Sequence, residues 1–113
     1  MKRWNGWGDD TFVYPLPRSA AVFLEETIGP TTPPRDVALS EVVATVPASR
    51  LPAHALVETD PVGRVGHARG QSLPDWIALR SGRIPAFPDG LAYLTTGQQV
   101  RELLAYAEQV GAG

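Results

Sequence analysis

The chain has 113 residues, 43% of them hydrophobic, and a formal net charge of -2. This length suits one small domain or a piece of a larger one, and the acidic balance argues against a general nucleic-acid-binding protein, which normally carries a basic excess. The absence of cysteine excludes disulfides and thiolate chemistry. No apolar run approaches the roughly 20 residues that span a bilayer, and no signal peptide is recognisable. We therefore expect a cytoplasmic protein without a transmembrane segment.

The sequence begins with an unusual tryptophan motif, KRWNGWG at residues 2–8. Each indole ring can bury on the order of 200 Å², and a chain terminus frays unless something ties it down. The motif therefore predicts that Trp4 and Trp7 anchor the terminus onto a domain body. Asp9 and Asp10 follow directly, and for them we favour a cap or a solvated pair over a cation site.

The first half of the chain predicts two helices separated by proline-rich segments. Residues 11–17 are apolar, and two prolines among them favour an extended backbone. A helix is predicted at residues 18–28, with Ala20, Phe23, Leu24 and Ile28 on one face and a Gly-Pro stop signal after it. A short helix is predicted at residues 39–46. Residues 47–62 predict irregular structure, with a turn or helix start at residues 60–61.

The second half contains clearer start and stop signals. Ser72 and the following Leu-Pro-Asp predict the start of a helix that runs to Ser81-Gly82. Residues 90–94 predict a short strand. Thr96 with Gln99 predicts a capping box for a helix that ends at Gly111. A strand followed by a helix is half of a β-α-β unit, so we expect an α+β fold in which this unit is truncated.

No catalytic constellation is visible in the sequence. His54 and His67 lie apart and have no cysteine or paired carboxylates near them, and the GxSxG, HExxH and phosphate-loop motifs are absent. The sequence therefore predicts no catalytic, cofactor-binding or metal-binding residue. Four arginines form a locally basic region. In one alternative they bind an anion such as phosphate or carboxylate. In the second alternative they pair with acidic groups of a larger body or face water. We favour the second alternative. The four residues are Arg64, Arg69, Arg80 and Arg83.

Three motifs together resemble the alkylglycerone-phosphate synthase family of the vanillyl-alcohol-oxidase superfamily. KRWNGWG at residues 2–8 is similar to the (K/R)WNGWG opening of that family. Residues 60–82 contain RV, then HARGQSL, then LRSG, similar to a second family segment. RIP and PDG at residues 83–90, with the predicted strand and helix after them, resemble the entrance to the PCMH-type FAD-binding domain. The resemblance covers nearly the whole chain, and WNGWG is its specific element.

The resemblance implies the N-terminal part of an FAD-dependent oxidoreductase or of an enzyme that exchanges an acyl chain for an alkyl chain in ether-lipid synthesis. Residues 1–82 would be a helical and irregular segment packed on the flavin domain, and residues 83–113 would begin that domain. The loop that holds FAD would lie beyond residue 113. The partners implied are the remainder of the flavoenzyme and a homo-oligomer of it, and we expect this chain alone to be inactive.

A second hypothesis of a different class stays open. The chain would then be a stand-alone interaction domain that docks a partner through its tryptophans and its exposed strand.

Overall fold

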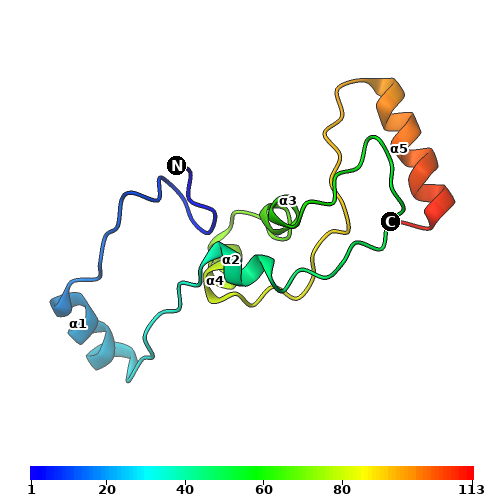
Figure 1. Cartoon of the computed structure of the whole chain (residues 1–113). Coiled ribbons are helices and arrows are strands. Elements are labelled where there is room, and N and C mark those ends of the chain that lie inside the picture. The colour runs from blue at the N-terminus through cyan, green and yellow to red at the C-terminus, as the bar shows by residue number, and fades with distance from the viewer.

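The computed structural model describes all 113 residues and contains five helices joined by long irregular segments. The helices are α1 (Arg18–Ile28), α2 (Leu39–Val43), α3 (Pro61–Gly66), α4 (Leu73–Ser81) and α5 (Gly97–Val110). In Figure 1, α2, α3 and α4 gather in the middle, while α1 and α5 lie at opposite ends. None of the helices is long and apolar enough to cross a membrane.

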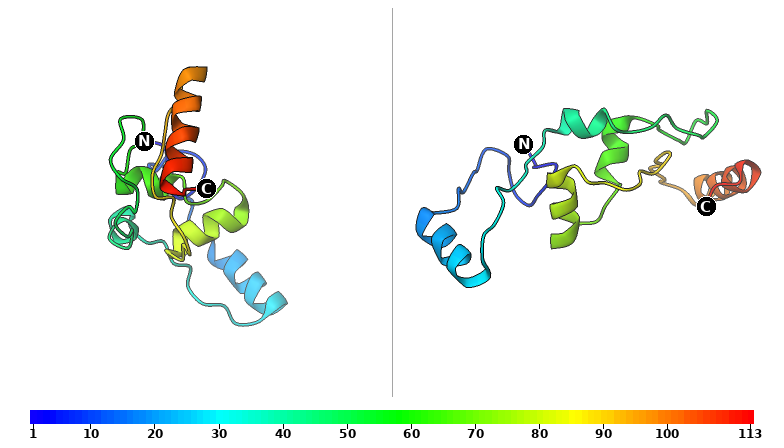
Figure 2. Two further views of the ribbon diagram at one scale, coloured as in Figure 1. Left: turned by 90° about the vertical axis from the view of Figure 1, so that its right-hand side faces the viewer. Right: turned by 90° about the horizontal axis from the view of Figure 1, so that it is seen from below.

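The molecule is elongated, with principal extents of 57 × 24 × 23 Å and a radius of gyration of 18.7 Å. A compact domain of this length would have a radius of gyration of about 13 Å. The right-hand view in Figure 2, seen from below, shows the same extension, with α1 carried at one end by two extended arms. Only 8 of 113 residues are buried. The chain therefore builds a small centre of packing and leaves most of its apolar side chains outside it.

The small core collects one or two residues from each of α2 to α5. They are Val42, Val65, Trp76, Leu79 and Tyr106. Helix α2 packs directly against α3, and α4 supplies two of the buried side chains, Trp76 and Leu79. Tyr106 belongs to a separate contact at the far end, where its hydroxyl donates to the Pro52 carbonyl at 2.5 Å and its ring packs on the His54 ring. The core is therefore discontinuous along the length of the molecule.

Local capping signals explain where the helices begin and end. The Ser72 side chain accepts from the Asp75 N–H, and Asp75 accepts in return from the Ser72 N–H, so the predicted helix start at α4 is confirmed. The Thr96 side chain accepts from the Gln99 N–H, and Gly111 ends α5 in the left-handed conformation. The predicted bounds of the first helix, residues 18–28, are also confirmed. Its apolar face, however, packs on nothing, because no residue of α1 is buried.

The predicted helix at residues 39–46 is shorter in the structure and ends at Val43. The Thr45 hydroxyl donates to the Val42 carbonyl at 2.7 Å, and the Thr45 N–H donates to the same carbonyl. These local bonds turn the chain out of the helix. Pro47 then disfavours a helical conformation at Val46.

The α+β prediction is wrong, because the regular structure of the chain is helical and no sheet forms. Of the predicted strand at residues 90–94, only Leu91 pairs, in an isolated antiparallel bridge with Glu58 whose two hydrogen bonds are each 2.8 Å long. The bridge cannot extend on the Glu58 side, because Val57 closes a turn onto His54 before it and Pro61 begins α3 after it. A strand-helix start of a PCMH-type domain is therefore not present.

Glycine allows this bridge to form at close range. A Cβ on Gly90 would lie 2.6 Å from Val57 Cγ1 and 3.2 Å from the Glu58 carbonyl oxygen. Real Cβ atoms essentially never approach a neighbour below 3.0 Å, so the loop at residues 51–58 could not lie against residue 90 if it carried a side chain. The bridge thus joins residues on the two sides of position 82, where the family resemblance implies a domain boundary.

Candidate functional site

The first ten residues form a closed turn, here called the N-terminal turn. The Arg3 N–H donates to the Gly8 carbonyl and the Asp10 N–H donates to the Met1 carbonyl, each at 2.9 Å. Gly8 adopts a φ of +85°, which residues with a side chain rarely do. A Cβ on Gly6 would lie 2.8 Å from Arg3 Cδ. Gly8 is therefore required by the backbone of the turn, whereas Gly6 leaves room for the Arg3 side chain.

The turn is docked on Asp36 by a buried side-chain amide and on α4 by a backbone carbonyl and an aromatic contact. Asn5 is only 3% exposed, and its Nδ2 donates to Asp36 Oδ1 at 2.7 Å. Its carbonyl accepts from Arg80 Nε at 3.2 Å. The Trp7 ring meets the Trp76 ring edge-to-face with centroids 5.9 Å apart. The expectation that the motif anchors the terminus thus has a structural counterpart within this chain, although Trp7 itself stays 63% exposed.

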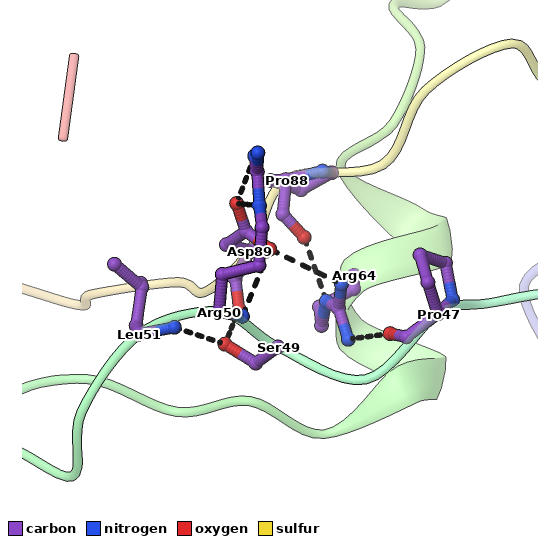
Figure 3. Close-up of polar contacts among 7 residues, drawn as sticks. All are labelled: Pro47, Ser49, Arg50, Leu51, Arg64, Pro88 and Asp89. Carbon is purple, nitrogen blue, oxygen red and sulfur yellow. Dashed lines mark hydrogen bonds and ion pairs between the residues drawn. The ribbon is translucent and has the colours of Figure 1, made fainter.

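A second cluster, the Arg64 junction, ties three distant segments together (Figure 3). Arg64 is 2% exposed, and its guanidinium donates to the Pro47 carbonyl at 2.7 Å and the Pro88 carbonyl at 2.6 Å. Its Nη2 lies 3.9 Å from Asp89 Oδ1. Asp89 also receives two hydrogen bonds from the Arg50 guanidinium and one from the Arg50 N–H. One side chain of α3 therefore holds the segments on both sides of it in place.

The structure uses three of the four predicted basic residues internally. Arg64 lies at its junction, Arg80 holds Asn5, and Arg69 Nε lies 3.1 Å from Asp75 Oδ1. Arg83 makes no ion pair and no side-chain hydrogen bond within the chain. The acidic partners of Arg64 and Arg69 are Asp89 and Asp75, which belong to this chain.

The histidines and the two early aspartates make local contacts. His54 Nδ1 accepts from the Leu56 N–H at 3.1 Å, and His67 Nδ1 lies 2.9 Å from the Gly63 carbonyl oxygen. Asp9 and Asp10 both pair with the N-terminal ammonium, at 2.7 and 3.0 Å. These bonds, together with those from Thr11, lower the pKa of Asp9 to about 2. The two histidines are therefore engaged separately, and no group of three candidate ligand side chains gathers anywhere in the chain.

Hydrogen bonds lower the pKa of two further aspartates. The Arg50 guanidinium and N–H hold the pKa of Asp89 below its ordinary value of 3.8, with a smaller contribution from Arg64. The Ser72 hydroxyl and N–H do the same for Asp75, helped by Arg69. A carboxyl whose pKa is lower in the folded chain contributes stability that is present above its unfolded pKa. That contribution is lost as the pH falls through the folded pKa.

We accordingly expect the urea midpoint to be constant from neutral pH down to about pH 4 and to fall below it. In Asp89→Asn the midpoint should be lower at neutral pH, and its decline in acid should be shallower. The measurement is a series of urea titrations followed by far-ultraviolet circular dichroism. Glu102→Gln on exposed α5 is the matched control. If the urea midpoint of Asp89→Asn declined with falling pH in parallel with that of the unmodified chain, Asp89 would not be a source of the acid-sensitive stability.

Two of the hollows of the molecule lie next to its centre, and a further one of about 690 Å³ lies between the N-terminal turn and the segment that leads to α1. One, of about 490 Å³, lies between α5 and the loops near residues 50 and 90 and is lined mainly by apolar groups such as Leu51, Leu91 and Leu103. The other, of about 260 Å³, lies beside the N-terminal turn and is lined by Lys2, Arg3, Arg69 and two tryptophans, among others. Beyond them, large apolar side chains lie exposed on the arms and on α1.

Sequence reasoning missed the partners rather than the motifs. It singled out Trp7 and Arg80 but predicted no contact of Asn5, Asp36 or Trp76. Asn5 lies 31 residues from Asp36 and 75 from Arg80, and the partner of Trp7 is in α4. The polar residue placed between two tryptophans in WNGWG is the one available signal for Asn5. Comparison of the chain with protein-family models, with curated proteins and with solved structures finds no match.

Proposed function

We propose that this chain is a docking segment of a larger flavin-dependent enzyme similar to alkylglycerone-phosphate synthase, and that it contributes binding surface rather than catalytic groups. The observation that carries the proposal is the imbalance of its apolar residues. Five hydrophobic residues are buried, whereas large ones such as Phe12, Phe23 and Ile28 are more than 60% exposed. Exposed apolar patches of this kind mark surfaces that another body covers.

Helix α1 supports the proposal most directly. Phe23 and Ile28 are 64% and 70% exposed, and no residue of the helix is buried. A helix of 11 residues is marginal in water without tertiary packing, so its apolar face needs a partner surface. The flavoenzyme identity of that surface comes from the resemblance of the WNGWG, HARGQSL and LRSG motifs.

The proposal is tested by flavin content. The purified 113-residue chain should remain colourless with FAD, whereas co-expression with the coding sequence adjoining its own should give a yellow complex. Phe23→Asp should lower the flavin content of that complex without changing the unfolding of the isolated chain, because Phe23 makes no core contact. Glu26→Gln is the matched control on the same helix.

Three results would count against the proposal. Stoichiometric FAD on the chain alone would contradict a purely docking role. Full flavin loading of the Phe23→Asp complex would remove α1 from the docking surface. An adjoining sequence without a glycine-rich flavin loop would favour the second candidate, a stand-alone interaction module. The projecting position of α1 in Figure 1 also favours that candidate.

A further inference from the structure

The hollow beside the N-terminal turn concentrates positive charge without any acidic lining residue. Lys2, Arg3 and Arg69 all line this cavity of about 260 Å³, and no aspartate or glutamate does. Lys2 makes no ion pair in the chain, and the Arg3 guanidinium donates only to the Phe12 carbonyl. Like charges that converge on one hollow repel one another unless an anion lies between them.

One buried donor at the same cavity lacks an acceptor. Trp76 is 8% exposed and lines the cavity, and its Nε1–H has no hydrogen-bond partner. Arg69 Nε, in contrast, faces Asp75 Oδ1 at 3.1 Å. A buried donor without a partner costs about 1–3 kcal/mol, so the Trp76 N–H favours an acceptor oxygen from outside the chain.

From these two observations we propose that the cavity binds a tetrahedral oxyanion, a phosphate or sulfate group. The three cationic side chains and the Asp75 carboxylate beside Arg69 together carry a net charge of +2, which matches a doubly charged anion, and arginine forks suit its oxygens. Gly66 and Gly70 line the cavity and leave its rim open. A Cβ on Gly70 would lie 2.8 Å from Asp75 Oδ2, so the glycine leaves room for the Asp75 carboxylate. The Asp75 carboxylate accepts from the Ser72 N–H and hydroxyl and faces Arg69 through Nε. The Nη donors of Arg69 therefore remain for a ligand.

The site is independent of the proposed docking function, because it requires only residues of the centre and the N-terminal turn. It also differs from the anion contact that the sequence allowed for four arginines. Arg64 and Arg80 are committed to carbonyl groups of the chain, while Lys2 and Arg3 join Arg69 through the turn.

The test is a titration of the full chain with inorganic phosphate, followed by the indole N–H resonances in ¹H–¹⁵N NMR spectra. The Trp76 resonance should shift saturably with phosphate and with sulfate, but not with chloride at equal ionic strength. Lys2→Gln and Arg69→Gln should each weaken binding roughly tenfold. Arg101→Gln, which removes the same charge from exposed α5, should leave the affinity unchanged. Lys2→Gln removes no contact of the fold, so loss of binding in that variant cannot be attributed to unfolding.

Further arms of the titration distinguish the source of the group. Methyl phosphate binding as tightly as inorganic phosphate would indicate the phosphoryl group of a small molecule, and preferential binding to vesicles of phosphatidic acid would indicate a lipid headgroup. The proposal is overturned if phosphate gives no saturable shift, or if Arg101→Gln weakens binding as much as Lys2→Gln does.

Discussion

Replacing Arg64 by alanine is expected to lower the free energy of unfolding by about 3 kcal/mol. The substitution removes the donors to the carbonyl groups of Pro47 and Pro88, whose hydrogen bonds to Arg64 are partly buried, and the cation beside Asp89. Each carbonyl left without a partner costs about 1–3 kcal/mol. The measurement is equilibrium unfolding in urea.

Arg64→Lys separates charge from geometry in the same experiment. Lysine keeps the positive charge but cannot reach two carbonyls with a planar fork, so its loss of stability should be intermediate. Arg101→Ala on the exposed face of α5 should change stability by less than about 0.5 kcal/mol. An Arg64→Ala variant as stable as Arg101→Ala would show that the junction does not hold the segments together.

Replacing Trp76 by alanine is the other change with a large expected effect, about 3 kcal/mol or more. The ring is nearly buried in α4 and provides the aromatic contact for Trp7. Its loss should destabilise the centre and also release the N-terminal turn. Urea titration measures the first effect, and acrylamide quenching of Trp7 fluorescence, in a background with Trp4→Phe, measures the second.

The neighbouring residue offers a matched control for this prediction. Ile77 lies next to Trp76 in α4 but is 60% exposed, so Ile77→Ala should cost little stability and leave Trp7 quenching unchanged. Trp76→Phe should retain part of the aromatic contact and give a smaller loss. Equal effects of the Trp76 and Ile77 substitutions would contradict the anchoring of the turn on α4.

Elements set by nearby residues could be predicted from the sequence, whereas those set by distant residues could not. The starts of α4 and α5 depend on Ser72 and Thr96, whose hydroxyls bond three residues ahead, and the sequence shows both. The strand at residues 90–94 was predicted from an apolar run alone. A strand exists only where a second segment pairs with it, and only Glu58 is placed to do so.

The same distinction applies to the candidate site. The WNGWG motif and the basic arginines were visible as residue types, yet their roles depend on contacts across 17 to 75 residues of sequence. Arg64 has no local feature that distinguishes it from Arg83, although the Arg64 side chain is 2% exposed and that of Arg83 lies exposed. Burial of an arginine is decided by tertiary contacts, which periodicity does not report.

The central claim is that the chain has a small centre of its own and leaves α1 for another surface to cover. Hydrogen–deuterium exchange on the purified, monomeric 113-residue chain tests it most directly, because amide protection reports local stability. We predict that residues 18–28 exchange within seconds while α4 and the loops at the Arg64 junction exchange far more slowly. Protection of α1 equal to that of α4 in the monomer would contradict the claim.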